Sequence, residues 1–248
     1  GTSSFVEEVR AFAKACPATE IILGLQRDER LEQETTLKDA TLLNVLFADV
    51  EKDEISLVDE AQKALGKSLV GIYIPLEIAN FTSSSQFAAR VRTHFAKVTK
   101  AAKNIDVYVS LHFNSQTGNR NAEGKPCYFS GVTKPGDATK EFLRSILETT
   151  GIDHVLMQDG AAARCRTAKD FVAWATPYFE DVRSVSKELN MSFGVIVEAM
   201  KPANEQLLEK QLDLAHSYSA DVYVFEYLTH LKDAEVRKAY SEVTARWR

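Results

Sequence analysis

The sequence predicts an α/β fold of the TIM (β/α)8 barrel type, formed by a single domain over residues 1–248. Short apolar segments rich in β-branched residues alternate along the chain with longer segments of helical periodicity. This alternation is typical of parallel strands joined by helices. No predicted strand leads into a GxGxxG or GxxxxGK[ST] loop. A doubly wound nucleotide-binding fold is therefore disfavoured, because such folds hold phosphates in those loops.

Predicted helices are recognised by apolar residues that repeat at intervals of three and four. In the first of them, Phe5, Val9 and Phe12 share one face, which predicts that this face packs against the protein. The second segment fits either one helix or two. The predicted helices cover residues 5–15, 41–65, 84–103, 138–149, 171–189, 204–218 and 234–247.

The clearest predicted strand is LVGIYIPLEI, an apolar run that ends in the carboxylate of Glu77. Its β-branched residues, such as Ile72 and Ile74, suit a strand buried on both faces. The predicted strands cover residues 20–25, 69–78, 107–113, 154–160, 192–200 and 222–227. A complete barrel has eight strands. Either two strands are undetected, within residues 26–68, or the first two are missing from this chain.

Composition sets limits on the class of protein. The chain is 45% hydrophobic and 26% charged, as in ordinary globular proteins with a substantial core. A net charge of −5 argues against a nucleic-acid partner, because such binders usually carry a basic stripe. No apolar run approaches the ~18 residues of a membrane span. The sequence leaves the oligomeric state open. It also leaves the compartment open, because a secreted or periplasmic protein can have lost its leader.

The three cysteines, Cys16, Cys127 and Cys165, are far apart and odd in number. Their spacing predicts neither a disulfide framework nor a CxxC metal or redox site. One disulfide remains possible. We expect no cofactor.

Polar residues stand at or near the ends of five of the six predicted strands. In a barrel, the carboxyl ends of all strands meet at one mouth, where catalytic groups gather. Any single acid could instead cap the next helix or pair with an arginine, but parallel strands rarely need several acids for stability. The residues in question are Glu77, His112, Gln158, Asp159, Glu198 and Glu226.

The chain resembles the DUF4434 family of uncharacterised bacterial TIM-barrel proteins, which are similar to glycoside hydrolases. The segments that carry the resemblance are GIYIPLEI, YVSLHF, GIDHVLMQDG, GVIVEAM with the later Gln211, and YVFEYLTH. They extend over about residues 20–230. The resemblance implies that residues 20–25 form the third strand of the barrel, residues 69–77 the fourth and residues 222–227 the eighth.

The resemblance also implies a chemistry. Retaining glycosidases of this fold often carry an acid/base glutamate after strand four and a nucleophilic glutamate after strand seven, which are the places of Glu77 and Glu198. Retention requires the two carboxyl groups to lie about 5 to 5.5 Å apart. We expect a carbohydrate substrate and no resident metal. The residues expected to bind that substrate are Tyr73, His112, Gln158, Asp159, Glu226 and Tyr227.

Two other functions fit the same residues. Glu77, His112, Asp159 and Glu198 could ligate a divalent ion in a metal-dependent sugar isomerase or a phosphodiesterase-type barrel. A non-catalytic barrel that binds a glycan or a protein is the second alternative, because a fold does not determine a function.

Overall fold

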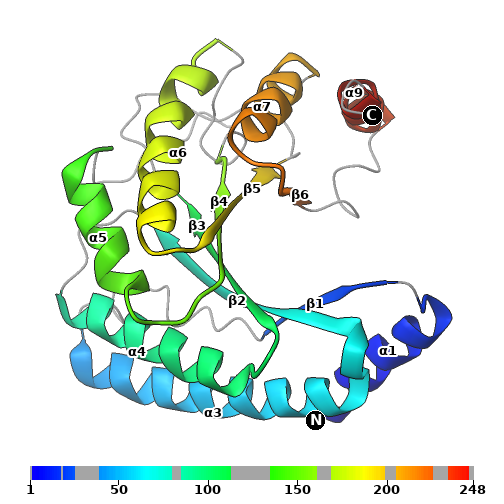
Figure 1. Ribbon diagram of the computed structural model, residues 1–248, viewed down its shortest axis with the longest axis vertical. Coiled ribbons are helices and arrows are strands. Elements are labelled where there is room, and N and C mark those ends of the chain that lie inside the picture. The colour runs from blue at the N-terminus through cyan, green and yellow to red at the C-terminus, as the bar shows by residue number, and fades with distance from the viewer. Residues whose placement is uncertain are drawn as a thin grey trace. The chain divides into compact units, whose positions relative to one another are not determined.

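The computed structural model describes residues 2–17, 19–25, 39–79, 85–112, 135–160, 169–198, 205–225 and 234–245. Within them, a helix separates each strand from the next one along the chain (Figure 1). The strands belong to a six-stranded sheet in the order β1-β2-β3-β4-β5-β6, so that sheet order follows chain order. The predicted α/β architecture is therefore confirmed.

All six predicted strands are present, and each begins and ends within two residues of the prediction. Two neighbouring pairs, β1 with β2 and β5 with β6, are parallel. The strands are β1 (Ile21–Gly24), β2 (Leu69–Ala79), β3 (Asp106–His112), β4 (His154–Gln158), β5 (Ser192–Glu198) and β6 (Val222–Phe225).

The predicted helices are also present, with ends within three residues of the prediction. The second segment forms one continuous helix of 26 residues. It begins after Asp39, whose carboxylate accepts hydrogen bonds from the backbone N–H groups of Thr41 and Leu42, and it ends before Gly66, which has a positive φ of 54°. The helices are α1 (Thr2–Ala15), α3 (Ala40–Leu65), η2 (Gly66–Ser68), α4 (Ser85–Ala101), α5 (Asp137–Leu147), α6 (Phe171–Glu188), α7 (Glu205–Tyr218) and α9 (Ala234–Ala245).

The chain divides into two compact units, which are described separately below. The first consists of Gly1–Glu77, Ser83–Ser110 and Leu143–His154. The second consists of Ile78–Thr82, Leu111–Phe142 and Val155–Arg248. The prediction of a single domain over residues 1–248 stays a prediction.

In the first unit, helices α3 and α4 run side by side (Figure 1). Phe47 of α3 and Phe95 of α4 are fully buried, as are Ile72 and Ile74 of β2. These four side chains form part of the hydrophobic core, and burying each of them contributes about 1.5 to 3 kcal/mol.

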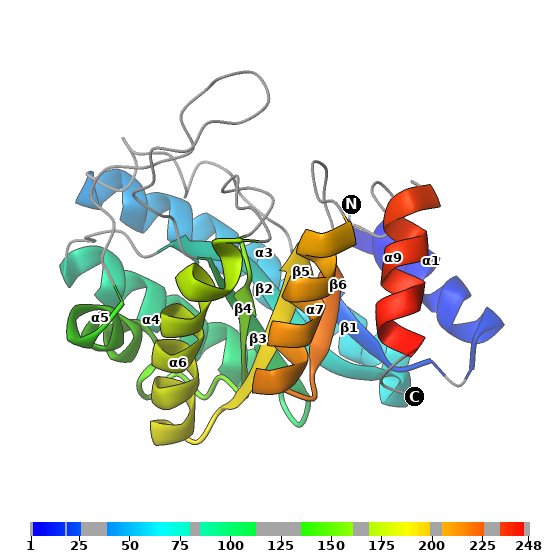
Figure 2. The same ribbon diagram turned by 90° about the horizontal axis from the view of Figure 1, so that it is seen from above.

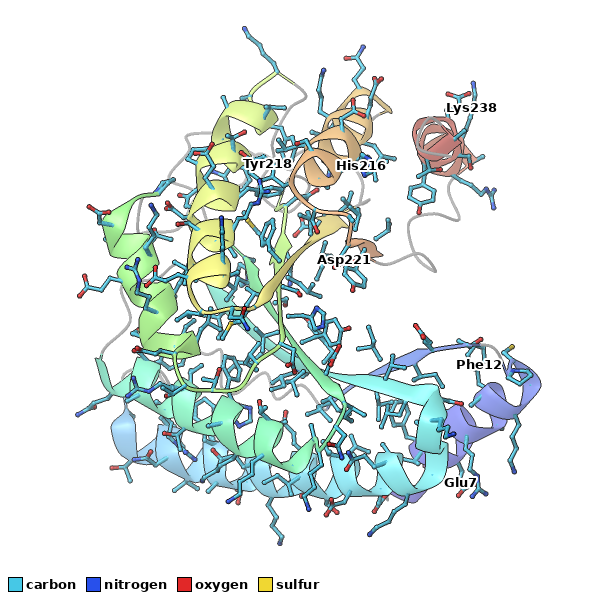
Figure 3. The ribbon with its side chains drawn as sticks, in the orientation of Figure 1. Glu7, Phe12, His216, Tyr218, Asp221 and Lys238 are labelled. Carbon is cyan, nitrogen blue, oxygen red and sulfur yellow. The ribbon has the colours of Figure 1, made fainter. Side chains whose placement is uncertain are left out.

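In the second unit, helices α6 and α7 lie next to each other and against β5 (Figure 1, Figure 2). The ring of Phe179 in α6 contacts the rings of Phe193 in β5 and Tyr218 in α7, with centroid distances of 6.2 and 5.4 Å. Tyr218 stands at the end of α7 (Figure 3), and its hydroxyl donates to Glu180 of α6. Aromatic packing thus joins the two helices to the strand.

The buried face of α1 differs from the predicted one. Val6 and Ala13 are buried, whereas Phe5 and Phe12 are 45% and 54% exposed. Figure 3 shows Phe12 on α1. The prediction that Phe5 and Phe12 face the protein was therefore wrong. A helical pattern shows which residues share a face, but the packing partner decides which face is covered.

None of the described helices is long and apolar enough to cross a membrane. Pro135 and Gly136 form a turn directly before α5.

Candidate functional site

The second unit brings polar side chains together at the carboxyl ends of β4 and β5. Asp159 follows the last residue of β4, and Glu198 is the last residue of β5. Both follow apolar strand residues that are buried, such as Met157 and Val197. The apolar strands therefore fix the position at which each acid stands.

Glu198 lies on the sheet face opposite to the helices. Phe193 contacts Phe179 of α6, and Val195 and Val197 are completely buried. Side chains alternate between the two faces of a strand. Ile196 and Glu198 therefore point to the other face of β5.

Asp159, Glu198 and Gln211 are joined by a set of hydrogen bonds. The backbone N–H of Glu198 donates to Oδ1 of Asp159 at 3.3 Å. Nε2 of Gln211, which comes from α7, donates to Oδ2 of Asp159 at 2.7 Å and to the backbone carbonyl of Glu198 at 3.1 Å. The exposed fractions are 0% for Asp159 and Gln211 and 5% for Glu198. The donors offset part of the cost of burying the Asp159 carboxylate.

The carboxylate of Asp159 takes the place of a backbone carbonyl as the acceptor of one hydrogen bond at the edge of the sheet ladder. The backbone N–H of Asp159 donates to the carbonyl of Ile196 at 2.9 Å. A regular parallel ladder would continue with a bond from the N–H of Glu198 to the carbonyl of Asp159. The chain turns here instead, at Gly160 with a φ of 64°, and the Asp159 side chain accepts the bond.

Three other predicted residues are described. His112 and Gln158, the last residues of β3 and β4, are partly exposed and belong to the second unit. Tyr73 of β2 belongs to the first unit, and its hydroxyl lies 2.6 Å from Oγ of Ser110. Their roles in binding a substrate stay predictions.

The remaining predicted residues are only partly described. Glu77 lies in β2, but its side chain is outside the described part of the structure, and it belongs to the first unit whereas Glu198 belongs to the second. Glu226 and Tyr227 lie outside the described residues. The roles predicted for these residues also stay predictions.

Gln211 received no role in the sequence analysis, although a signal was present. It lies three residues after Leu208 and four after Leu207, which are both buried. A polar residue in this position lies on the apolar face of the helix. Such a residue must find a buried partner, and here the partners are Asp159 and Glu198.

A second buried polar cluster lies in the first unit, between α3 and α4. Glu51 accepts from Lys97 at 2.6 Å and pairs with Arg90 at 2.9 Å. Nε2 of His94 lies 3.2 Å from Glu54, and its Nδ1 lies 3.7 Å from Glu51. Both glutamates and His94 are at most 4% exposed. In the sequence these residues fall within the predicted helices 41–65 and 84–103, and their spacing gives no sign of a cluster.

The two glutamates of this cluster differ in charge. Burial raises the pKa of Glu54 to about 8, and the negative charge of Glu51 adds to the effect. Burial alone would also raise the pKa of Glu51, but the contacts with His94, Lys97 and Arg90 outweigh it and hold the pKa at about 2. Burial lowers the pKa of His94. At neutral pH, Glu51 is therefore ionised, while Glu54 carries a proton.

Among the described residues, no group of three or more His, Cys, Asp or Glu side chains is arranged to hold a metal ion. In the α3–α4 cluster, for example, Glu51 and Glu54 lie near different nitrogens of the His94 ring. The predicted metal ligands include Glu77, whose side chain is not among those described.

Alternating strands and helices, with acids at the carboxyl ends of strands, are features of the TIM-barrel-type enzymes. Solved structures similar to this chain belong to that class. One is a provisionally assigned α-L-fucosidase from Bacteroides thetaiotaomicron, with a TM-score of 0.58 and 16% identity over 81% of this chain and 64% of that one. Another is the endo-1,4-β-D-mannanase of Thermotoga petrophila RKU-1, with a TM-score of 0.52 and 13% identity over 85% of this chain and 67% of that one.

These similarities establish a TIM-barrel-like fold and nothing finer. The chain spans about two thirds of the length of either protein. No family model matches the chain, and no curated protein matches it.

Proposed function

We propose that this chain carries a glycoside hydrolase site in which Glu198 is the nucleophile and Glu77 is the acid/base. The observation that supports the proposal is the position of Glu198, a buried carboxylate at the end of β5 whose side chain leaves the sheet on the face opposite to the helices. In TIM-barrel enzymes, catalytic groups stand at this end of the strands.

The proposed barrel numbering follows from the DUF4434 resemblance. In a (β/α)8 barrel in which β1 is the third strand, β2 is the fourth and β5 is the seventh. Glu77, near the end of β2, and Glu198, the last residue of β5, then belong to the strands that carry the two catalytic acids in many retaining glycosidases.

The proposed reaction has two steps. The Glu198 carboxylate attacks the anomeric carbon while the protonated Glu77 gives its proton to the leaving oxygen, so that one glycosidic bond breaks and a glycosyl ester forms. Glu77 then takes a proton from water, whose oxygen displaces Glu198 and restores both carboxyl groups. The sheet holds each acid on a strand, which reduces the freedom of the reacting groups.

Substrate contacts are proposed for the residues around these acids. His112 and Gln158 are partly exposed and can hydrogen-bond sugar hydroxyls, as we propose also for Tyr227. Asp159, which the sequence analysis expected to bind the substrate, is completely buried and is given no substrate contact here. Glu226 would hold the substrate or the nucleophile. The ring of Tyr73 offers a stacking surface.

The test is turnover of a panel of aryl α- and β-glycosides, beginning with fucosides and mannosides. Glu198→Gln and Glu77→Gln each remove one ionisable carboxyl group with little change of volume. We expect kcat/KM to fall by about 10³-fold or more in each variant. Glu141→Gln serves as the matched control, because Glu141 is exposed on α5, and it should keep full activity. Unchanged turnover in Glu198→Gln would remove Glu198 from the mechanism.

The competing functions give different results in the same assays. A metal-dependent enzyme would lose activity with a chelator and regain it with a divalent ion. A glycan-binding protein would retain the sugar on an affinity matrix and turn over no glycoside. Activity that resists chelation but disappears in Glu198→Gln would support the glycosidase.

A further inference from the structure

Both the backbone N–H and the backbone C=O of Glu198 form hydrogen bonds to side chains at the end of β5. We propose that Gln211 and Asp159 are positioning residues, which hold the main chain of Glu198 and thereby direct its carboxylate. This inference deepens the proposed function and rests on it for its effect on catalysis. The sequence analysis expected the carboxylate of Asp159 to bind the substrate. We propose instead that it positions Glu198.

The bonds form a closed ring. From the N–H of Glu198 the ring passes to Oδ1 of Asp159, across the carboxylate to Oδ2, on to Nε2 of Gln211, and back to the carbonyl oxygen of Glu198. The N–H and the C=O of one residue are thus both held. A rotation about either backbone dihedral of Glu198 breaks at least one of these bonds.

The ring lies where the sheet stops providing partners on this side. Gly160 has a φ of 64°, and the Asp159 carboxylate accepts the bond that the backbone carbonyl of Asp159 would take in a regular ladder. Gln211 supports that carboxylate from α7, a different element of the same unit. Glu198 is therefore fixed by the strand before it, the end of β4 and a helix.

The chemistry of Gln211 agrees with this role. Its two Nε2 hydrogens serve the two acceptors of the ring, so the orientation of the amide is determined. Its Oε1 is then left buried, with no hydrogen-bond partner in the described part of the chain. A leucine on this helix face would bury no unsatisfied oxygen. The amide is explained by the two bonds that it donates.

Substrate contact by Asp159 would conflict with the ring. Both of its carboxylate oxygens accept bonds from groups that surround Glu198, and the side chain is completely buried. Because the side chain has no exposed surface, a sugar hydroxyl could reach Asp159 only if the groups packed around it moved apart. Its geometry favours contact with the protein.

Hydrogen exchange of single amides, measured by NMR, tests the ring directly. Gln211→Met removes both donors and keeps a similar volume, and Asp159→Asn removes one of the two acceptors. In each variant we expect the protection of the Glu198 amide to fall at least about tenfold. The Asp159 amide, which is bonded to Ile196 in the sheet, should change less than about twofold. Gln206→Met, an exposed position on the same helix, is the matched control.

Two results would overturn the proposal. If the Glu198 amide keeps its protection in both variants, the ring does not hold it. If Glu198 and Asp159 lose protection equally, Gln211 only stabilises the region as a whole. Neither result depends on any enzymatic activity, so this test decides the role of the ring even if the chain cleaves no glycoside.

Kinetics test the catalytic consequence. On a glycoside that the wild-type protein cleaves, Gln211→Met should lower kcat about 10- to 100-fold and change KM little, because the nucleophile is misdirected while the sugar contacts remain. Wild-type kcat in this variant would show that positioning by Gln211 is wrong while the proposed function stands. An inactive wild-type protein would instead contradict the proposed function.

Discussion

Nε2 of His94 lies 3.2 Å from Oε2 of Glu54 inside the interface of α3 and α4. Because Glu54 carries a proton at neutral pH and His94 does not, this contact joins a neutral acid to a neutral base. The nearby Glu51 is ionised and paired with Arg90 and Lys97. The buried cluster therefore makes the stability of the first unit depend on pH in two opposite ways.

Glu54 makes the fold less stable as the pH rises. Its pKa is about 8 in the folded protein and 4.5 ordinarily, so the folded state binds the extra proton between these values. The contribution of Glu54 to the free energy of unfolding is fully present below about pH 4.5 and is lost as the pH rises towards 8. Glu54→Gln cannot ionise, and we expect it to exceed the wild type by about 2 kcal/mol or more in free energy of unfolding at pH 9.

Urea unfolding at pH 5 and pH 9 measures this difference. At pH 5 the two proteins should differ much less, because Glu54 is protonated in the folded wild type. Asp53→Asn, at an exposed position on the same helix, is the matched control. A Glu54→Gln variant with the same advantage at both pH values would contradict the assigned protonation.

Glu51 has the opposite effect. Its pKa is about 2 in the folded protein, so its contribution is present above about pH 4.5 and is lost as the pH falls towards 2. Glu51→Gln leaves Arg90 without its carboxylate partner and should lower the free energy of unfolding by about 3 to 5 kcal/mol at pH 7. The loss should shrink steadily in unfolding experiments between pH 4.5 and pH 2.5. A loss independent of pH would mean that packing, and not charge, explains it.

Gly194 of β5 leaves little room for a side chain. A Cβ atom there would lie 2.7 Å from Cδ2 of Leu156 and 3.2 Å from the backbone oxygen of Asp221. We expect Gly194→Ala to destabilise the protein by about 1 to 3 kcal/mol. Gly24→Ala in β1 is the matched control, because the nearest atom to its Cβ, Cδ1 of Tyr73, is 3.8 Å away. Thermal unfolding of both variants measures the contrast, and equal melting temperatures would contradict it.

The hydrogen bond between Tyr73 and Ser110 links side chains of β2 and β3. Tyr73→Phe removes the hydroxyl and should cost about 0.5 to 1.5 kcal/mol. A double-mutant cycle with Ser110→Ala isolates the contribution of the pair. If the two single changes simply add, the 2.6 Å contact contributes no coupling to stability.

The positions of the acids at the strand ends could be predicted from the sequence, whereas the hydrogen bonds that join them to other residues could not. Asp159 and Glu198 follow apolar runs, so their place at the ends of β4 and β5 could be predicted. Their bonds to Gln211 join residues 52 and 13 positions apart. The sequence shows that a polar residue lies on the apolar face of α7, but only the folded chain shows which groups that residue meets.

By itself the sequence determined the α/β class and the order and approximate bounds of the helices and strands. Hydrophobic periodicity is a local property, and it reports directly on which residues of an element share a face. The tertiary structure decided that Val6, and not Phe5, is buried in α1, and that Glu51, Glu54 and His94 form one cluster. It also decided that Gln211 closes a ring around Glu198. Burial and side-chain pairing depend on which elements meet, and that information is not local.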